Sequence, residues 1–174
     1  MAEYYMLHKP RGCITARRDE RCKTVMDYFP EEKRDRLFPV GRLDKDTVGL
    51  MILTNDGALA HRLLSPRHHV EKRYYFEADE PLPPTVSDDF RDGVVLRDGY
   101  ECKEAKIELD PTCKSGVITL TEGKYHQIKR MIASFNNRVT YLERISFGRI
   151  ELDRGLLRGE WRLLTKDEEA LLKN

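Results

Sequence analysis

The sequence predicts an α+β protein with a mixed, largely antiparallel sheet and flanking helices. Three observations predict this class: several short apolar runs of strand length, a few amphipathic helical segments, and no regular alternation of strand and helix. Parallel strands need a long crossover between them, whereas many of these runs are joined by short connections. The 174 residues are enough for one domain with a sizeable core, or for two small lobes sharing a cleft.

Prolines and turn residues mark the ends of the elements expected in the first half of the chain. Pro30 and Pro66 end helical segments because proline lacks an amide hydrogen. The run LMILT at 50–54 is typical of a buried strand. The expected elements are a strand at 4–8, a turn at 9–12, an exposed loop at 15–23, a helical turn at 24–29, an extended segment at 37–43, a strand at 50–54 and a helix at 58–65. In that last helix, Leu59, Leu63 and Leu64 are expected on one side.

The second half predicts further strands and three helices. The helix expected at 125–135 is the clearest, since Tyr125, Ile128, Ile132 and Phe135 follow helical spacing. A proline-rich stretch makes the region near 79–85 the candidate lobe boundary. The expected strands are at 70–78, 105–109, 116–121, 139–145 and 161–164, and the other helices at 86–90 and from residue 166 onward.

The net charge of +1 conceals an uneven distribution along the chain. Residues 1–73 carry 15 Lys/Arg and 11 Asp/Glu, residues 74–120 carry 5 and 11, and residues 121–162 carry 9 and 5. If the two basic segments fold together, they form a positive surface suited to a polyanion. On charge alone, evenly solvated side chains remain the simpler interpretation. No apolar run approaches the ~20 residues of a membrane helix, and the N-terminal segment lacks a signal-peptide pattern, so we expect no membrane association.

The cysteines and histidines do not predict a metal site or a disulfide framework. None of the four cysteines forms a CxxC pair or lies close to paired histidines, so we expect reduced thiols in the cytoplasm and no bound metal. The adjacent His68 and His69 point apart on a strand or loop. A surface or RNA-facing role suits them better than metal binding.

The segment VGRLDKDTVGL at 40–50 has an unusual composition for a connection between two strand-like runs. Asp44 lies close to Arg42, and Asp46 and Thr47 can form local hydrogen bonds that stiffen the loop. The residues alone leave two interpretations open. One is a capped loop with surface ion pairs, and the other is a rigidly held carboxylate that takes part in chemistry.

Four motifs in order make the sequence similar to a known family. GRLDKDTVGLMILTNDG resembles the signature of the pseudouridine synthases, in the branch that modifies ribosomal RNA and includes the small-subunit enzyme. HKPRG at 8–12, LLSPRHHVEKRYYF at 63–76 and EGKYHQIKRM at 122–131 resemble its other motifs. The resemblance extends from about Tyr4 to Leu164. It implies the pseudouridine synthase catalytic fold with a central cleft, one catalytic domain over 1–174, and a reaction that needs neither cofactor nor metal.

The resemblance also implies three catalytic residues. Asp44 is the expected nucleophile or base. Tyr74 is expected to stack on the target uracil and to help move the proton from carbon 5. Lys129 is expected to pair with Asp44 and keep it ionised beside the polyanionic substrate. Without the resemblance, a core aromatic is an alternative for Tyr74, although a weaker one than for Tyr75 and Phe76. Position alone favours a solvated helix residue for Lys129.

Basic side chains are expected to bind the RNA. Arg42 is expected to contact the RNA backbone or to occupy the space that the extruded base leaves. The others expected along the RNA path are Lys9, Arg11, Arg17, Arg18, Arg67, His68, Lys72 and Arg130. The partner implied is ribosomal RNA or a subunit assembly intermediate, and the expected oligomeric state is a monomer.

Other functions remain possible at the sequence level. The alternatives are a large-subunit ribosomal RNA synthase, a non-catalytic RNA-binding module of the same fold, a structural ribosome-associated protein, and an acid/base hydrolase using Asp44 and Asp46. The hydrolase leaves EGKYHQIKRM unexplained. Many members of the family carry a small RNA-binding domain of the ribosomal-protein-S4 type before the first motif, and we expect this chain to lack it.

Overall fold

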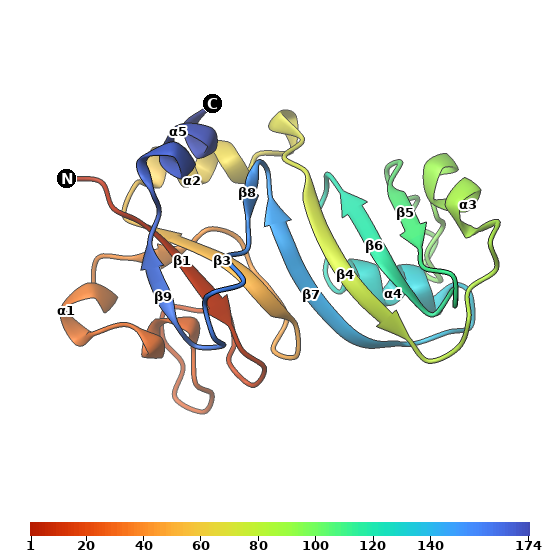
Figure 1. The fold of residues 1–174 in the computed structure, drawn as a ribbon, viewed down its shortest axis with the longest axis horizontal. Helices are drawn as coiled ribbons and strands as arrows, with labels where there is room; N and C mark the ends of the chain where they lie inside the picture. The colour runs from red at the N-terminus through yellow and green to blue at the C-terminus, as the bar shows by residue number, and fades with distance from the viewer. The chain divides into compact units, whose positions relative to one another are not determined.

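The computed structural model describes all 174 residues and divides into two compact units (Figure 1). Unit 1 comprises 1–70 and 144–174, and unit 2 comprises 71–143. The predicted boundary near 79–85 is wrong, because this segment lies inside unit 2. Leu82, which is 2% exposed, belongs to the hydrophobic core of that unit, whereas the prolines on either side of it are exposed.

Unit 1 is organised around a central strand, β1. Its strands are β1 (Tyr4–Lys9), β2 (Phe38–Pro39), β3 (Val48–Thr54), β8 (Ile150–Glu151), β9 (Trp161–Leu163) and the last part of β7 (Val139–Phe147). β1 pairs antiparallel with β3 on one side, with Lys9 opposite Gly49, and with β9 on the other. Every residue of β3 is buried. The strands predicted at 4–8 and 50–54 are therefore confirmed, whereas the extended segment at 37–43 contains only the two-residue β2.

The helices of unit 1 are short. They are the 3-10 helices η1 (Val25–Tyr28) and η2 (Pro66–His68), and the α-helices α1 (Glu31–Arg34), α2 (Gly57–Leu64) and α5 (Lys166–Lys173). The Asp56 side chain caps α2 by accepting a hydrogen bond from the Leu59 amide. Leu64, expected on the same side of this helix as Leu59 and Leu63, is 48% exposed. Leu59, Ala60 and the partly buried Leu63 form the inner face of α2 and leave Leu64 facing solvent.

Unit 2 packs two helices against a curved sheet. Its elements are β4 (Lys72–Ala78), α3 (Val86–Asp92), β5 (Lys106–Leu109), β6 (Ser115–Leu120), α4 (Gln127–Ala133) and the first part of β7, and its strands run in the order β5-β6-β4-β7 (Figure 1). β4 pairs antiparallel with β6, which pairs antiparallel with β5. Phe76, Phe90 and Ile132 are among its fully buried core residues.

The helix predicted at 125–135 begins later than expected. α4 starts at Gln127, because His126 adopts a left-handed backbone conformation with φ of 48° and cannot continue the helix. Ile128 and Ile132 are buried as predicted, but Tyr125 lies outside the helix and is 77% exposed. The apolar spacing therefore identified the buried face and misplaced the first turn.

The pairs β1–β3, β1–β9, β2–β3, β4–β6, β5–β6 and β7–β8 are antiparallel, which confirms the predicted α+β class with a largely antiparallel sheet. Strand β7 belongs to both units, because its residues up to Glu143 lie in unit 2 and those from Arg144 onward lie in unit 1. No helix combines the length and the apolar character needed to cross a membrane.

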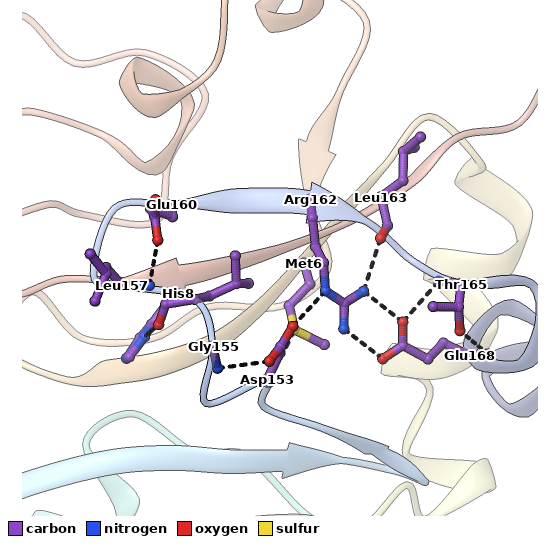
Figure 2. Close-up of polar contacts among 11 residues, drawn as sticks. Met6, His8, Asp153, Gly155, Leu157, Glu160, Arg162, Leu163, Thr165 and Glu168 are labelled. Carbon is purple, nitrogen blue, oxygen red and sulfur yellow. Dashed lines mark hydrogen bonds and ion pairs between the residues drawn. The ribbon is translucent and has the colours of Figure 1, made fainter.

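Arg162 of β9 joins separate segments of unit 1 (Figure 2). Its Nε donates to Asp153 Oδ2 at 2.9 Å, and its Nη1 and Nη2 donate to the two carboxylate oxygens of Glu168 at 2.7 and 3.0 Å. Glu168 also accepts from the Thr165 amide at the start of α5. The hydrogen bonds from Arg162 hold the pKa of Glu168 below its ordinary value. The guanidinium therefore fixes β9 to both the preceding loop and the last helix.

We expect Arg162→Met to lower the free energy of unfolding by about 2 kcal/mol near neutral pH, because the largely buried Glu168 loses its two charge-assisted hydrogen bonds. The folded-state pKa of Glu168 is depressed, so this stabilisation is present above the unfolded carboxyl pKa of about 4.3 and is lost as pH falls through the folded value. Urea unfolding at neutral and strongly acidic pH measures the difference. The exposed Arg91→Met serves as the control. A deficit of equal size at acidic pH contradicts the linkage.

Candidate active site

Asp44 lies in the loop between β2 and β3 of unit 1, and it is partly buried. The Thr47 amide donates to the Asp44 carbonyl at 3.0 Å and closes a turn. On the other side, the Thr15 hydroxyl donates to the Leu43 carbonyl at 2.9 Å and accepts from the Leu43 amide at 3.0 Å. The backbone on both sides of the carboxylate is therefore fixed, as expected for a rigidly held group.

A buried lysine from β1 supports the same loop. The Lys9 side chain has no exposed surface, and its Nζ donates to the carbonyls of Pro10, Lys45 and Thr47 at 3.0, 3.2 and 2.7 Å. The prediction that Lys9 lines an RNA path is therefore wrong. The sequence KPRG suggested an exposed basic turn, but the ammonium points inward and satisfies carbonyls on both sides of Asp46.

At the start of β3, Gly49 packs directly against the backbone of Arg144. The sequence analysis did not predict this contact. Gly49 has φ of +111°, and a Cβ there would lie 2.3 Å from the Arg144 carbonyl oxygen. The Arg144 side chain is buried, and its Nε donates to the Leu50 carbonyl at 2.9 Å. The second glycine of the motif is thus required by close packing. A charged residue within the strand pattern TYLERISF was the available signal for Arg144.

Tyr74 and Lys72 lie on one face of β4 in unit 2, because alternate residues of a strand share a face. The Tyr74 ring is partly buried against the core that contains Phe76 and Ile128. The Lys72 ammonium lies beside Gly123, where an added Cβ would be 3.9 Å from its Nζ. The strand motif and the EGKYHQIKRM motif therefore meet within this unit.

A buried carboxylate fixes the loop that leads to Lys129. Glu122 accepts hydrogen bonds from the Tyr100 hydroxyl at 2.7 Å, the Lys103 amide at 2.8 Å and Gln127 Nε2 at 2.8 Å. Burial opposes ionisation of Glu122, but these hydrogen bonds prevail and keep its pKa below the ordinary value. The hydrogen bond to Glu122 raises the pKa of Tyr100 to about 12. Since Gln127 is the first residue of α4, Glu122 anchors the helix that carries the partly buried Lys129.

The remaining predicted RNA contacts differ in exposure. In unit 1 the exposed ones are Arg11, Arg17, Arg18, Arg42, Arg67 and His68. In unit 2, Lys72 and Arg130 are partly buried, and Arg130 is paired with Asp98 and donates to the Tyr125 carbonyl. Asp44 belongs to unit 1, whereas Tyr74 and Lys129 belong to unit 2. The pairing of Asp44 with Lys129 and the central cleft stay predictions.

The four cysteines are free, and no three His, Cys, Asp or Glu side chains are grouped so that they could hold a metal ion. The site residues described above therefore comprise a braced carboxylate, a half-buried tyrosine on a strand, and helix and surface cations. Carboxylate, phenol and ammonium groups are residue types that serve in acid/base and nucleophilic chemistry.

The chain belongs to the RNA pseudouridylate synthase family, whose model matches residues 3–134. This range contains Asp44, Tyr74 and Lys129. The match confirms the family resemblance of the four sequence motifs and defines the class of enzyme.

Individual relatives agree over nearly the whole chain. An uncharacterized RNA pseudouridine synthase of Bacillus subtilis is 46% identical over 97% of this chain and 72% of its own length. The ribosomal small subunit pseudouridine synthase A of Pseudomonas aeruginosa is 45% identical over 96% of this chain and 73% of its own. A crystal structure of a pseudouridylate synthase, 38% identical, superposes with a TM-score of 0.94 and covers 99% of this chain and 74% of that one.

We expect Lys9→Met to lower the free energy of unfolding by about 3 kcal/mol, because three carbonyls lose a charged donor in the interior. Urea unfolding measures this, and Lys114→Met, at an exposed position, is the matched control. Hydrogen exchange should also increase at the Thr47 amide, which closes the Asp44 turn. Unchanged stability together with unchanged exchange contradicts the bracing role.

Proposed function

We propose that this chain converts a specific uridine of small-subunit ribosomal RNA into pseudouridine, with Asp44 as the essential carboxylate. The observation that carries the proposal is the GRLD loop, in which Asp44 is fixed from both sides and braced by a buried lysine. Membership of the RNA pseudouridylate synthase family supports the reaction. The similarity to a ribosomal small subunit enzyme at 45% identity supports the choice of RNA.

The reaction is an isomerisation. The bond between N1 of uracil and C1′ of ribose breaks, the base turns, and C5 forms a new bond to C1′. The proton on C5 is then lost and N1 takes up a proton, so atoms and electrons balance without an oxidant or reductant. Asp44 either attacks C1′ or removes a ribose proton to give a glycal, and both routes require it in the ionised form.

The other predicted residues supply access and charge. Extruding a base from structured RNA costs a few kcal/mol, which stacking on Tyr74 offsets. The positive charge of Lys129 offsets the negative charge of the RNA phosphates beside Asp44, and its compact ammonium makes the pairing less directional than arginine would. Arg42 contacts the backbone beside the extruded nucleotide. Proton transfer from C5 involves the Tyr74 hydroxyl.

The RNA path uses cations from both units. With Lys9 removed from the set, the residues proposed to contact RNA are Arg11, Arg17, Arg18, Arg42, Arg67, His68, Lys72 and Arg130. Backbone contacts of this kind make affinity strongly dependent on salt. The enzyme acts as a monomer in the cytoplasm, on ribosomal RNA or on a subunit assembly intermediate.

We expect Asp44→Asn to abolish tritium release from 5-tritiated uridine in small-subunit RNA while RNA binding is retained, because the amide cannot act as a nucleophile or base. Asp46→Asn, two residues away on the exposed side of the loop, is the matched control and should remain active. Turnover by Asp44→Asn overturns the assignment. Release from large-subunit RNA alone keeps the reaction and overturns the choice of substrate.

We expect Tyr74→Phe and Tyr74→Ala to separate two roles of this side chain. The phenylalanine keeps the ring, so it should retain RNA binding but release tritium about a hundredfold more slowly, at the lower end of the range for one general acid/base group. The alanine should also lose affinity, since stacking is removed. Single-turnover tritium release and a binding isotherm distinguish the two. Wild-type rates in the phenylalanine variant contradict a proton-transfer role.

A further inference from the structure

The side chain of Tyr125 is 77% exposed, two residues before the start of α4. Single exposed apolar groups are common on protein surfaces and need no explanation by themselves. This ring, however, lies face to face with the imidazole of His126, with centroids 3.8 Å apart and planes inclined by 17°. One face of the tyrosine ring is thus supported by a second ring.

The backbone that presents this ring is firmly held. His126 adopts the left-handed conformation, which is uncommon for residues other than glycine. This conformation costs free energy and persists only where the surrounding structure enforces it. Arg130 Nη1 donates to the Tyr125 carbonyl at 3.1 Å. The Lys124 amide donates to Gln127 Oε1 at 2.9 Å, and the Gln127 amide donates to the Lys124 carbonyl at 3.1 Å. The tyrosine therefore projects from a rigid turn anchored on both sides.

The charge around Tyr125 differs from that of the rest of unit 2. Residues 74–120 carry 5 Lys/Arg and 11 Asp/Glu, whereas residues 123–131 contain Lys124, Lys129 and Arg130 and no acidic residue. Of these cations, Arg130 is paired with Asp98, and Lys124 has an exposed side chain beside Tyr125. Lys124 is itself placed 5.3 Å from the centroid of the Tyr100 ring. A preorganised, exposed aromatic flanked by cations is the arrangement that binds unpaired bases of single-stranded nucleic acid.

We propose that Tyr125 is a stacking platform for an unpaired base of the substrate RNA, distinct from the uridine that reacts. The ring takes the base and the neighbouring cations Lys124 and Arg130 take its phosphates. This inference rests on the proposed function only in that RNA is the substrate. Stacking needs no chemistry at Asp44, so the two proposals fail in different experiments.

The test measures binding of a fluorescently labelled single-stranded oligouridylate of about 12 nucleotides, within the range of known single-stranded site sizes. Every variant is made in the Asp44→Asn background, so that no turnover occurs. We expect Tyr125→Ala to raise the Kd at least about fivefold, which is the lower end of the effect of losing one stacked base. Tyr125→Phe should stay within about twofold, because the ring is retained.

Salt dependence separates stacking from charge. The slope of log Kd against log salt should be unchanged in Tyr125→Ala, since no cation is lost, whereas Lys124→Ala should reduce it by about 0.7. Leu157→Ala, which removes another side chain that is 70% exposed, is the control and should bind as the parent does. Circular dichroism of each variant confirms that the fold is kept.

Three results overturn the platform: an unchanged Kd in Tyr125→Ala, equal weakening in the alanine and phenylalanine variants, or equal weakening in Leu157→Ala. An unchanged Kd combined with normal tritium release by the wild type would overturn the platform and leave the proposed function standing. Loss of stacking in an enzyme that releases no tritium would support the platform and overturn the reaction.

Discussion

The arrangement of unit 1 depends on the hydrogen bonds that the buried ammonium of Lys9 donates to backbone carbonyls. A cation without exposed surface is tolerated in a protein only where hydrogen-bond acceptors surround it, and here three carbonyls from two segments meet that requirement. Two of those carbonyls belong to the loop that carries Asp44. Lys9 is also the last residue of β1, where it pairs with Gly49 of β3. The same residue therefore takes part in the β1–β3 pairing and holds the loop that precedes β3.

The same principle operates in unit 2 with the opposite sign. Glu122 is a buried anion whose three donors come from Tyr100, Lys103 and Gln127, and it anchors the turn before α4. The motifs that hold Asp44 and Lys129 are therefore each adjacent to a buried charge that binds the protein rather than the substrate. Such a group is costly to leave unpaired, which gives each loop a single favourable conformation. Arg162 extends this bracing to β9 and α5 with partly exposed partners.

The sequence predicted the strands, the class and the family well, because apolar runs and turn residues report local structure directly. β3 was recognisable from LMILT, and the cap of α2 from the Asn-Asp-Gly turn. The errors have a common physical origin. Lys9 is polar yet buried, and Tyr125 is aromatic yet exposed, so each side chain departs from the environment that its chemistry favours. Burial of Lys9 depends on carbonyls more than thirty residues away in the sequence. Exposure of Tyr125 depends on the left-handed backbone of His126. Neither cause is visible in a hydropathy pattern. Both departures occur at the motifs where function is expected.

The discontinuity of unit 1 has a consequence for biosynthesis. β1 is made first, and β3 follows within about fifty residues, but its other neighbour, β9, begins only at Trp161. At a translation rate of about 5–20 residues per second, one edge of β1 therefore waits at least several seconds for its partner. During that interval, the contiguous unit 2 is synthesised in full. An unpaired, apolar strand edge is a template for association with other chains, so slow elongation through residues 71–160 should favour aggregation of the nascent protein, and early chaperone contact with β1 should suppress it.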